Sequence, residues 1–356
     1  MRNIWMFVLS VFLVGNGLAQ DDEFIDKLDS LGGLDDSTKA IMAYNNGLDL
    51  MSAKDFSQAI QQFNEAFSKN NEMHDAIFNR GLCYKHLGSY DKAIGDWNSV
   101  IAKDSTHELA RYEIAHYYFK EGKYAEAQPH LDELMKMNPK EAKYAYDRGV
   151  IDFVNGDLDA ALEKYNAALN ANPKHAYALN DRGSIYMKNG ELDKAIADYE
   201  KAAKADSKSA FIFNNLGSAY RKNGDMDKAI EAYSKAVKLK DDYAIALNNR
   251  GMAYFAKGEL EKARGDFDKA LSIDAMYALA YNNRASISIK KEEWEAAVRD
   301  ANKAIELNAD FAYAYYNRAI AKEMLRDLDQ ACEDWNKSYE LGLDAGKTQM
   351  NIWCNQ

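Results

Sequence analysis

The sequence is poor in the residues that interrupt helices and in those that build most catalytic centres. Its 356 residues include only three prolines and three cysteines. Few prolines favour an all-helical chain, because proline removes a backbone donor and clashes inside a helix. No two of the six histidines lie three or four residues apart, and the sequence contains neither HExxH nor CxxC. We therefore expect no metal site, no cofactor and no enzymatic activity.

An excess of positive charge is also missing. Lysine and arginine number 45 against 56 aspartates and glutamates, which gives a formal net charge of −11. A phosphate-binding surface needs clustered basic residues, so this balance argues against a nucleic-acid partner. Long apolar runs are absent beyond the N-terminus, so we expect no transmembrane span in the mature chain.

Met1–Ala19 has the pattern of a secretory signal peptide. Arg2 precedes an apolar run, Ile4–Val14, and small residues follow before Gln20. This order predicts export after cleavage near Ala19. A membrane anchor is the alternative, but the run is shorter than the roughly 20 residues that a spanning helix needs. The sequence does not distinguish between the periplasm, association with an outer membrane and secretion.

What the sequence has in abundance is a repeated unit, of which Ala176–Ser209 is an example. Small or apolar residues recur in it at i, i+4 and i+7, the spacing of one helix face, in two successive stretches. Asn189-Gly190 separates the stretches, and glycine readily adopts the left-handed conformation that ends a helix. The unit therefore predicts helix, tight turn, helix.

The unit recurs nine times without insertion or deletion. We number its positions from its first residue. Position 20 is alanine in all nine units: Ala59, Ala93, Ala127, Ala161, Ala195, Ala229, Ala263, Ala297 and Ala331. Position 8 is glycine or alanine throughout. The predicted units are 40–73, 74–107, 108–141, 142–175, 176–209, 210–243, 244–277, 278–311 and 312–345, after an acidic lead at 20–39 and before a capping segment at 346–356.

Small residues at positions 8 and 20, with aromatic residues at 11 and 24, resemble the tetratricopeptide repeat. The resemblance implies an all-α, right-handed superhelical solenoid with a C-terminal capping helix. It also implies a non-catalytic scaffold that needs no cofactor. Neighbouring hairpins must stack, because one hairpin cannot bury its own apolar face.

Arginine at position 7 and aspartate at position 23 occur together, which predicts an ion pair inside each unit. Five units carry both residues: Arg80 and Asp96, Arg182 and Asp198, Arg250 and Asp266, Arg284 and Asp300, Arg318 and Asp334. The unit with Arg148 departs from the pattern by carrying Lys164. The alternative interpretation is that the arginines form a stripe that binds a ligand.

Cys332 and Cys354 lie nearly symmetrically about residue 343, next to a turn at Gly342. An antiparallel helical hairpin would bring them level, so we predict a disulfide in an oxidising compartment. Two buried free thiols are the alternative.

In the family that the chain resembles, the first helix of each repeat lines a concave groove, and positions 2, 5, 6, 9, 12 and 13 can face a ligand. Position 6 supplies Asn45, Asn79, Asp147, Asp181, Asn215, Asn249, Asn283 and Asn317, and position 5 supplies Asn180, Asn214, Asn248 and Asn282 together with the aromatic Tyr44, Phe78, Tyr112 and Tyr146. Amides can donate to and accept from a peptide backbone. The alternative is that these asparagines satisfy hydrogen bonds between helices.

These patterns predict an exported scaffold that holds a protein or an extended peptide in the groove. A carbohydrate-binding protein of the cell envelope, with groove tyrosines stacked on sugar rings, is the second hypothesis. Lysines and arginine at positions 2, 5 and 6 would clamp a C-terminal carboxylate in chaperone-binding members of the family. That set is missing here, so a chaperone adaptor is disfavoured.

Overall fold

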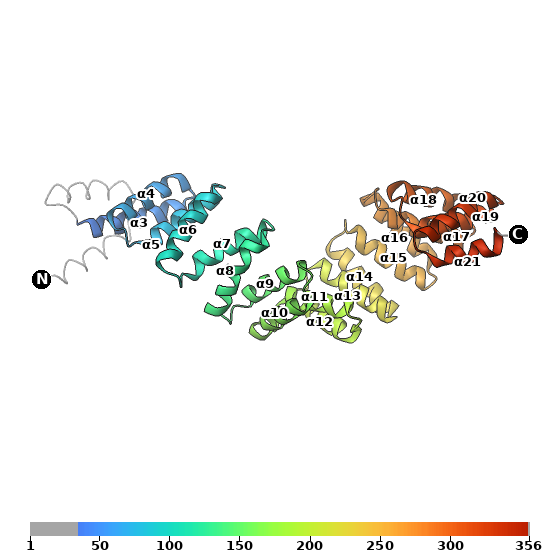
Figure 1. The fold of residues 1–356 in the computed structure, drawn as a ribbon, viewed down its shortest axis with the longest axis horizontal. Coiled ribbons are helices and arrows are strands. Elements are labelled where there is room, and N and C mark those ends of the chain that lie inside the picture. The colour runs from blue at the N-terminus through green and yellow to red at the C-terminus, as the bar shows by residue number, and fades with distance from the viewer. Residues whose placement is uncertain (1–34, 355–356) are drawn as a thin grey trace. The chain divides into compact units, whose positions relative to one another are not determined.

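The computed structural model describes residues 35–354, and this part of the chain is built of helices without a β-strand. Consecutive helices pair through short turns (Figure 1). The described residues divide into two compact units, 35–139 and 140–354. The predicted signal peptide, Met1–Ala19, lies outside the described residues. Across 35–354, no helix has both the length and the apolar character needed to cross a bilayer.

The first unit holds three helix pairs. Its helices are α3 (Asp36–Ser52), α4 (Phe56–Lys69), α5 (His74–His86), α6 (Tyr90–Lys103), α7 (Glu108–Lys120) and α8 (Tyr124–Met137). Helix α3 begins within the predicted acidic lead, four residues before Ala40, where Asp35 caps it by accepting a hydrogen bond from the Thr38 backbone at 2.7 Å. The lead therefore contributes the first turn of the first repeat.

The second unit holds six pairs and a final helix. Its helices are α9 (Ala142–Val154), α10 (Leu158–Ala171), α11 (Ala176–Lys188), α12 (Leu192–Ala205), α13 (Ala210–Asn223), α14 (Met226–Leu239), α15 (Ala244–Ala256), α16 (Leu260–Ile273), α17 (Ala278–Lys290), α18 (Trp294–Leu307), α19 (Ala312–Met324), α20 (Leu328–Glu340) and α21 (Asp344–Trp353). Each pair from α9 to α20 corresponds to one 34-residue repeat. We call the two helices of a repeat helix A and helix B.

Close packing of the two helices in a repeat depends on positions 8, 20 and 24. Every alanine at position 20 is completely buried. A Cβ added to Gly251 at position 8 would lie 2.6 Å from the ring of Phe267 at position 24, and five other repeats pair a glycine with an aromatic ring in the same way. A larger residue at position 8 would therefore push the ring out of the core.

The turn inside each repeat passes through the left-handed conformation at position 15. Six repeats place glycine there, and Gly190 has φ 81°. The other three use Lys54, Glu292 and Arg326, whose φ angles are 65°, 60° and 67°. The turn geometry is thus set by the helix pair and imposed on residues that do not favour it.

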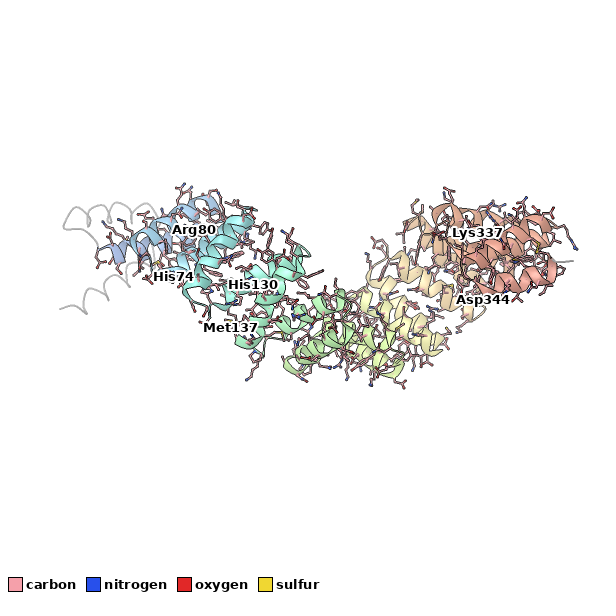
Figure 2. All side chains as sticks on the ribbon, in the orientation of Figure 1. His74, Arg80, His130, Met137, Lys337 and Asp344 are labelled. Carbon is pink, nitrogen blue, oxygen red and sulfur yellow. A yellow bond between two sulfur atoms is a disulfide. The ribbon has the colours of Figure 1, made fainter. Side chains whose placement is uncertain are left out.

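The last helix, α21, covers the end of the second unit. It packs on α20 and begins at Asp344, slightly before the predicted cap (Figure 2). A disulfide joins Cys332 on α20 to Cys354, with the Cα atoms 5.9 Å apart. Met350 and Cys354 pack against a core cluster that contains buried Trp335. The third cysteine, Cys83, is a buried free thiol whose pKa is raised to about 11 by burial.

Candidate functional site

The predicted site residues gather on one side of the A helices. Positions 2, 5 and 6 lie at i, i+3 and i+4, which places them on one helix face. Consecutive A helices of the second unit touch each other from α11 through α13, α15 and α17 to α19. The same positions therefore recur side by side from repeat to repeat. We call this surface, made of positions 2, 5 and 6, the helix-A face.

A hydrogen bond joins position 5 of one repeat to position 6 of the next, 35 residues later. Amide nitrogens at position 6 donate in five of these bonds, and a tyrosine hydroxyl donates in the sixth. The bonds are Asn79 to Tyr44 (3.0 Å), Tyr146 to Asp181 (2.9 Å), Asn215 to Asn180 (3.0 Å), Asn249 to Asn214 (3.0 Å), Asn283 to Asn248 (2.8 Å) and Asn317 to Asn282 (2.8 Å). We call this series the amide ladder.

Part of the amide ladder is a continuous chain of hydrogen bonds that ends on a carboxylate. Asn214 Nδ2 donates to Asn215 Oδ1 (3.5 Å), and Asn215 Nδ2 donates to Asn180 Oδ1 (3.0 Å). Asn180 Nδ2 then donates to Asp181 Oδ1 (2.9 Å), while Tyr146 donates to the other carboxylate oxygen. Every hydrogen bond in this chain is donated in the direction of Asp181. The Asp181 carboxylate is therefore the final acceptor, and it sets the orientation of the amides.

The amide ladder therefore holds neighbouring A helices together, as the alternative interpretation of the asparagines requires. The position-5 asparagines Asn180, Asn214, Asn248 and Asn282 are all buried. Asn45, in the first repeat, is exposed. Asn249 and Asn283 each use one of their two amide hydrogens in the ladder. Asn317 also donates to Ser286 and to the Asn282 backbone. Ligand contact by these amides stays a prediction.

The four position-5 aromatic residues pack against other rings of the protein. Ring centroids lie 5.8 Å apart between Tyr44 and Phe63, and 5.0 Å apart between Phe78 and His107. Tyr112 stacks on His116 at 5.4 Å. The fourth aromatic residue, Tyr146, lies 4.8 Å from His175 and 5.9 Å from Tyr165. These half-buried rings form part of the packing between helices.

The acidic residues at position 6 of the fourth and fifth repeats are Asp147, which is buried, and Asp181, which is partly buried. Burial raises the pKa of Asp147 from 3.8 to about 6, and Lys143 offsets the effect only partly. Burial also raises the pKa of Asp181, although hydrogen bonds from Asn180 and Tyr146 oppose the shift. A charged carboxylate in such a place costs folding free energy unless a positive group approaches it.

A row of mostly exposed apolar side chains at position 2 accompanies the amide ladder. Position 2 was among the positions expected to face a ligand, but sequence reasoning did not identify this apolar row. In the second unit the row comprises Tyr177, Phe211, Ile245, Leu279 and Tyr313. Tyr177 is 47% exposed, Ile245 49% and Tyr313 58%. The rings of Tyr177 and Phe211 stack with their centroids 5.8 Å apart, so the first two members touch. We call this row the position-2 stripe.

Each predicted arginine–aspartate pair is present, with a further contact that was not predicted. Arg182 donates from Nε and one terminal nitrogen to both oxygens of Asp198, at 2.7 and 2.8 Å. Its other terminal nitrogen donates to Asn166 in the preceding repeat at 2.7 Å. Arg80–Asp96, Arg250–Asp266, Arg284–Asp300 and Arg318–Asp334 repeat the arrangement, with third partners Asn64, Ser234, Asp268 and Asn302. Every third partner occupies position 25.

The exceptional fourth repeat uses a different carboxylate. Arg148 pairs with Asp152, one turn along the same helix, and both side chains are largely buried. Asp152 stands at position 11, where most repeats have tyrosine. Lys164, which replaces the usual aspartate, pairs with Glu163 instead (2.8 Å). Within residues 35–354, no group of three or more histidine, cysteine, aspartate or glutamate side chains is arranged to hold a metal ion.

Comparison with known families identifies the repeats. Four tetratricopeptide repeat models match the chain, and together they cover residues 44–107, 112–210 and 217–311. The chain belongs to the tetratricopeptide repeat family. Membership supports a protein-interaction role, since repeats of this family generally serve as non-catalytic scaffolds. A search of curated proteins finds no significant match.

Solved structures with the same fold include bacterial repeat proteins. A tetratricopeptide repeat protein from Parabacteroides merdae is 20% identical, with 70% of this chain and 99% of that chain covered and a TM-score of 0.54. The C-terminal part of a repeat protein from Cytophaga hutchinsonii is 22% identical, with 65% and 95% covered and a TM-score of 0.51. PilF from Pseudomonas aeruginosa is 17% identical, with 60% and 96% covered and a TM-score of 0.52. These similarities concern the fold.

Replacing Arg182 by alanine should destabilise the second unit by about 3 kcal/mol, because it leaves the buried Asp198 carboxylate without its partner. The change is measured as a shift of the urea midpoint. Asn166→Ala removes only the bond between repeats and should cost about 1 kcal/mol. An unchanged midpoint in Arg182→Ala would contradict the structural role and favour the ligand-stripe interpretation.

The raised pKa of Asp147 predicts a pH dependence of stability. The folded carboxyl holds its proton up to about pH 6, whereas the pKa of an aspartate in the unfolded chain is 3.8. Stability should therefore fall as the pH rises from about 4 to about 6. The loss is on the order of 2–3 kcal/mol.

Asp147→Asn should remove most of this loss and raise stability at pH 7, as measured by urea unfolding at several pH values. Asp193→Asn, at an exposed aspartate of α12, is the matched control and should leave the pH profile unchanged. A parallel profile for wild type and Asp147→Asn would show that Asp147 titrates normally.

Proposed function

We propose that the helix-A face of the second unit binds a polypeptide segment of another protein. The observation that carries the proposal is the position-2 stripe, a row of apolar side chains on five consecutive A helices. Four of them are exposed to water, and Phe211 is partly buried. Apolar surface of this kind gains free energy when a partner covers it, at roughly 25 cal/mol per Å². One contact per repeat suits a ligand that runs along the stack.

The polar groups beside the stripe define the chemistry of the segment. The amide ladder offers carbonyl oxygens and remaining amide hydrogens, which can bond to a peptide backbone whatever its side chains. Asp147, which is buried, and Asp181, which is partly buried, supply negative charge in the fourth and fifth repeats. A lysine or arginine of the ligand would compensate that charge, so we expect a segment with apolar residues and at least one basic residue.

The helix-A face supports a peptide better than a carbohydrate. Sugar binding by stacking requires an open aromatic face, and the position-5 rings Tyr44, Phe78 and Tyr112 have faces or edges against other rings of the protein. In the position-2 stripe, the ring of Tyr177 stacks on Phe211, and aliphatic Ile245 and Leu279 separate these rings from Tyr313. The aliphatic members suit apolar side chains. Glycan-array binding with no peptide binding would reverse this assignment.

The test uses a peptide selected from a random library on the mature chain, with affinity measured by fluorescence anisotropy. Ile245→Glu should weaken binding about tenfold or more, because a charge replaces an apolar contact worth at least ~1.4 kcal/mol. Leu279→Glu should act in the same direction. Both side chains are exposed, so the fold should be retained and circular dichroism should be unchanged.

Met276→Glu is the matched control. Met276 is 71% exposed but lies in a turn between repeats, outside the stripe. It should bind the peptide as the wild type does. Equal affinities for all three variants would place the peptide on another surface.

We also infer that the protein is exported and works outside the cytoplasm. Two independent features support this: the signal-like pattern of Met1–Ala19 and the Cys332–Cys354 disulfide, a bond typical of oxidising compartments. N-terminal sequencing of the protein from its native cells should begin at Gln20. A chain that retains Met1 and is found with cytoplasmic markers would contradict export.

A further inference from the structure

A polar hollow lies between the seventh and eighth repeats, away from the helix-A face. Its volume is about 280 Å³, and its walls come from α16, α17 and α18. Three arginines line it: Arg264 on α16, Arg284 on α17 and Arg299 on α18. No residue from positions 2, 5 or 6 contributes to the walls. The hollow is thus a feature separate from the amide ladder and the position-2 stripe.

The hollow exists where the repeat pattern loses a side chain. Position 11 is tyrosine in the second, third, fifth, sixth and seventh repeats, and it is Ser288 in the eighth. In the seventh repeat, Tyr254 fills the corresponding place and lies under the Arg250 guanidinium, 5.9 Å from its ring centroid. Ser288 lines the hollow and is too short to replace that ring. The space of the position-11 phenol group is therefore left open, and the Arg284 guanidinium lies against another ring, Tyr281 at position 4, 5.5 Å from its centroid.

The carboxylates in the walls are already engaged. Arg284 donates to both oxygens of Asp300, at 2.7 and 2.8 Å, and to Asp268 at 2.7 Å. Glu293 accepts from Arg264 at 2.5 Å and pairs with Lys291 at 3.4 Å. Each acid thus has at least one positive partner, which lowers its attraction for a further cation.

Unused donors remain on two of the arginines. Arg264 Nε is buried and has no hydrogen-bond acceptor among residues 35–354. Arg299 is exposed at the hollow, and no described side chain forms an ion pair with it. A guanidinium is donor-only and stays charged in proteins, so its unused N–H groups can be satisfied only by an acceptor.

We propose that this hollow binds a small oxyanion, the carboxylate or phosphate group of a ligand, between Arg264 and Arg299. The planar guanidinium groups match the geometry of both anions. Ser288 adds a hydroxyl that already accepts from Arg264 at 3.4 Å and can donate its own hydrogen to the anion. The anion occupies the place that the position-11 tyrosine takes in other repeats.

The test is isothermal titration calorimetry on the mature chain with its disulfide intact, at pH 7 and constant ionic strength set with sodium chloride. Inorganic phosphate and acetate are titrated separately. Saturable binding of one ion per chain by either probe is expected. Preference for phosphate identifies a phosphate-bearing ligand, and preference for acetate identifies a carboxylate. Absence of saturable binding by both would overturn the proposal.

Three variants locate the binding. Arg299→Ala should lower the affinity about tenfold or more, because it removes the unpaired guanidinium. Ser288→Tyr should abolish binding by refilling the space, and an undiminished melting temperature would show that the fold is kept. Lys201→Ala removes an exposed positive charge in the fifth repeat and should bind as the wild type does. Unchanged affinity in both hollow variants would also overturn the proposal.

Discussion

The close approach of helix A and helix B in each repeat is the contact on which the rest of the structure depends. Glycine at position 8 allows the ring at position 24 to lie against the backbone, as in Gly251 with Phe267. Alanine at position 20 is buried at the same interface in all nine repeats. Because six repeats share this glycine–ring contact and all nine share the alanine, their helix pairs have closely similar geometry.

Because the helix pairs have similar geometry, the same side-chain hydrogen bonds recur from repeat to repeat. Five arginines bond 16 residues forward, inside the repeat, and 16 residues backward, to position 25 of the preceding repeat. Amides bond across 35 residues in the amide ladder. Both series of hydrogen bonds join one repeat to the next. The stability of a repeat protein depends on these interfaces, because a single hairpin cannot bury its own apolar face. Polar contacts therefore supplement the apolar packing that holds the stack together.

The periodic part of this structure could be predicted from the sequence. Strict 34-residue spacing located the helix pairs, and the joint occurrence of arginine and aspartate identified the partner within the repeat. The third partner was not predictable in that way, because position 25 holds Asn64, Ser234 or Asp268 with equal effect. Any short polar acceptor serves there, so no single residue type marks it.

The position-2 stripe was missed for a different physical reason. The hydrophobic pattern of an amphipathic helix does not show whether an apolar residue at the edge of its apolar face is buried by the next helix or exposed to water. Ile245 and Leu279 lie at the edge of the buried face, and only the stacking of the repeats decides that they stay exposed. The same limit applies to the start of α3, which packing and a capping aspartate extend to Asp36.

Departures from the repeat are informative because the geometry around them is constant. Position 11 lies one turn after position 7, which is arginine in six repeats, and the residues found at position 11 form different contacts. Tyr220 donates to Glu200 of the preceding repeat, Asp152 pairs with Arg148, and Lys322 reaches Asp334 at 2.9 Å. Asp152 and Lys322 thus engage the arginine or aspartate of their own repeat directly. Tyr220 lies in a repeat that has Leu216 at position 7, and it bonds to position 25 of the preceding repeat.

Ser288 contacts Arg264 through a hydroxyl alone, at 3.4 Å, and leaves the remaining space open. A serine here gives up the packing of a ring that five of the seven preceding repeats have, and a buried donor of Arg264 has no acceptor among the described residues. Such a loss in an otherwise regular stack is expected where a ligand supplies the missing contacts. The hollow and the helix-A face would then let one scaffold hold two ligands on separate surfaces.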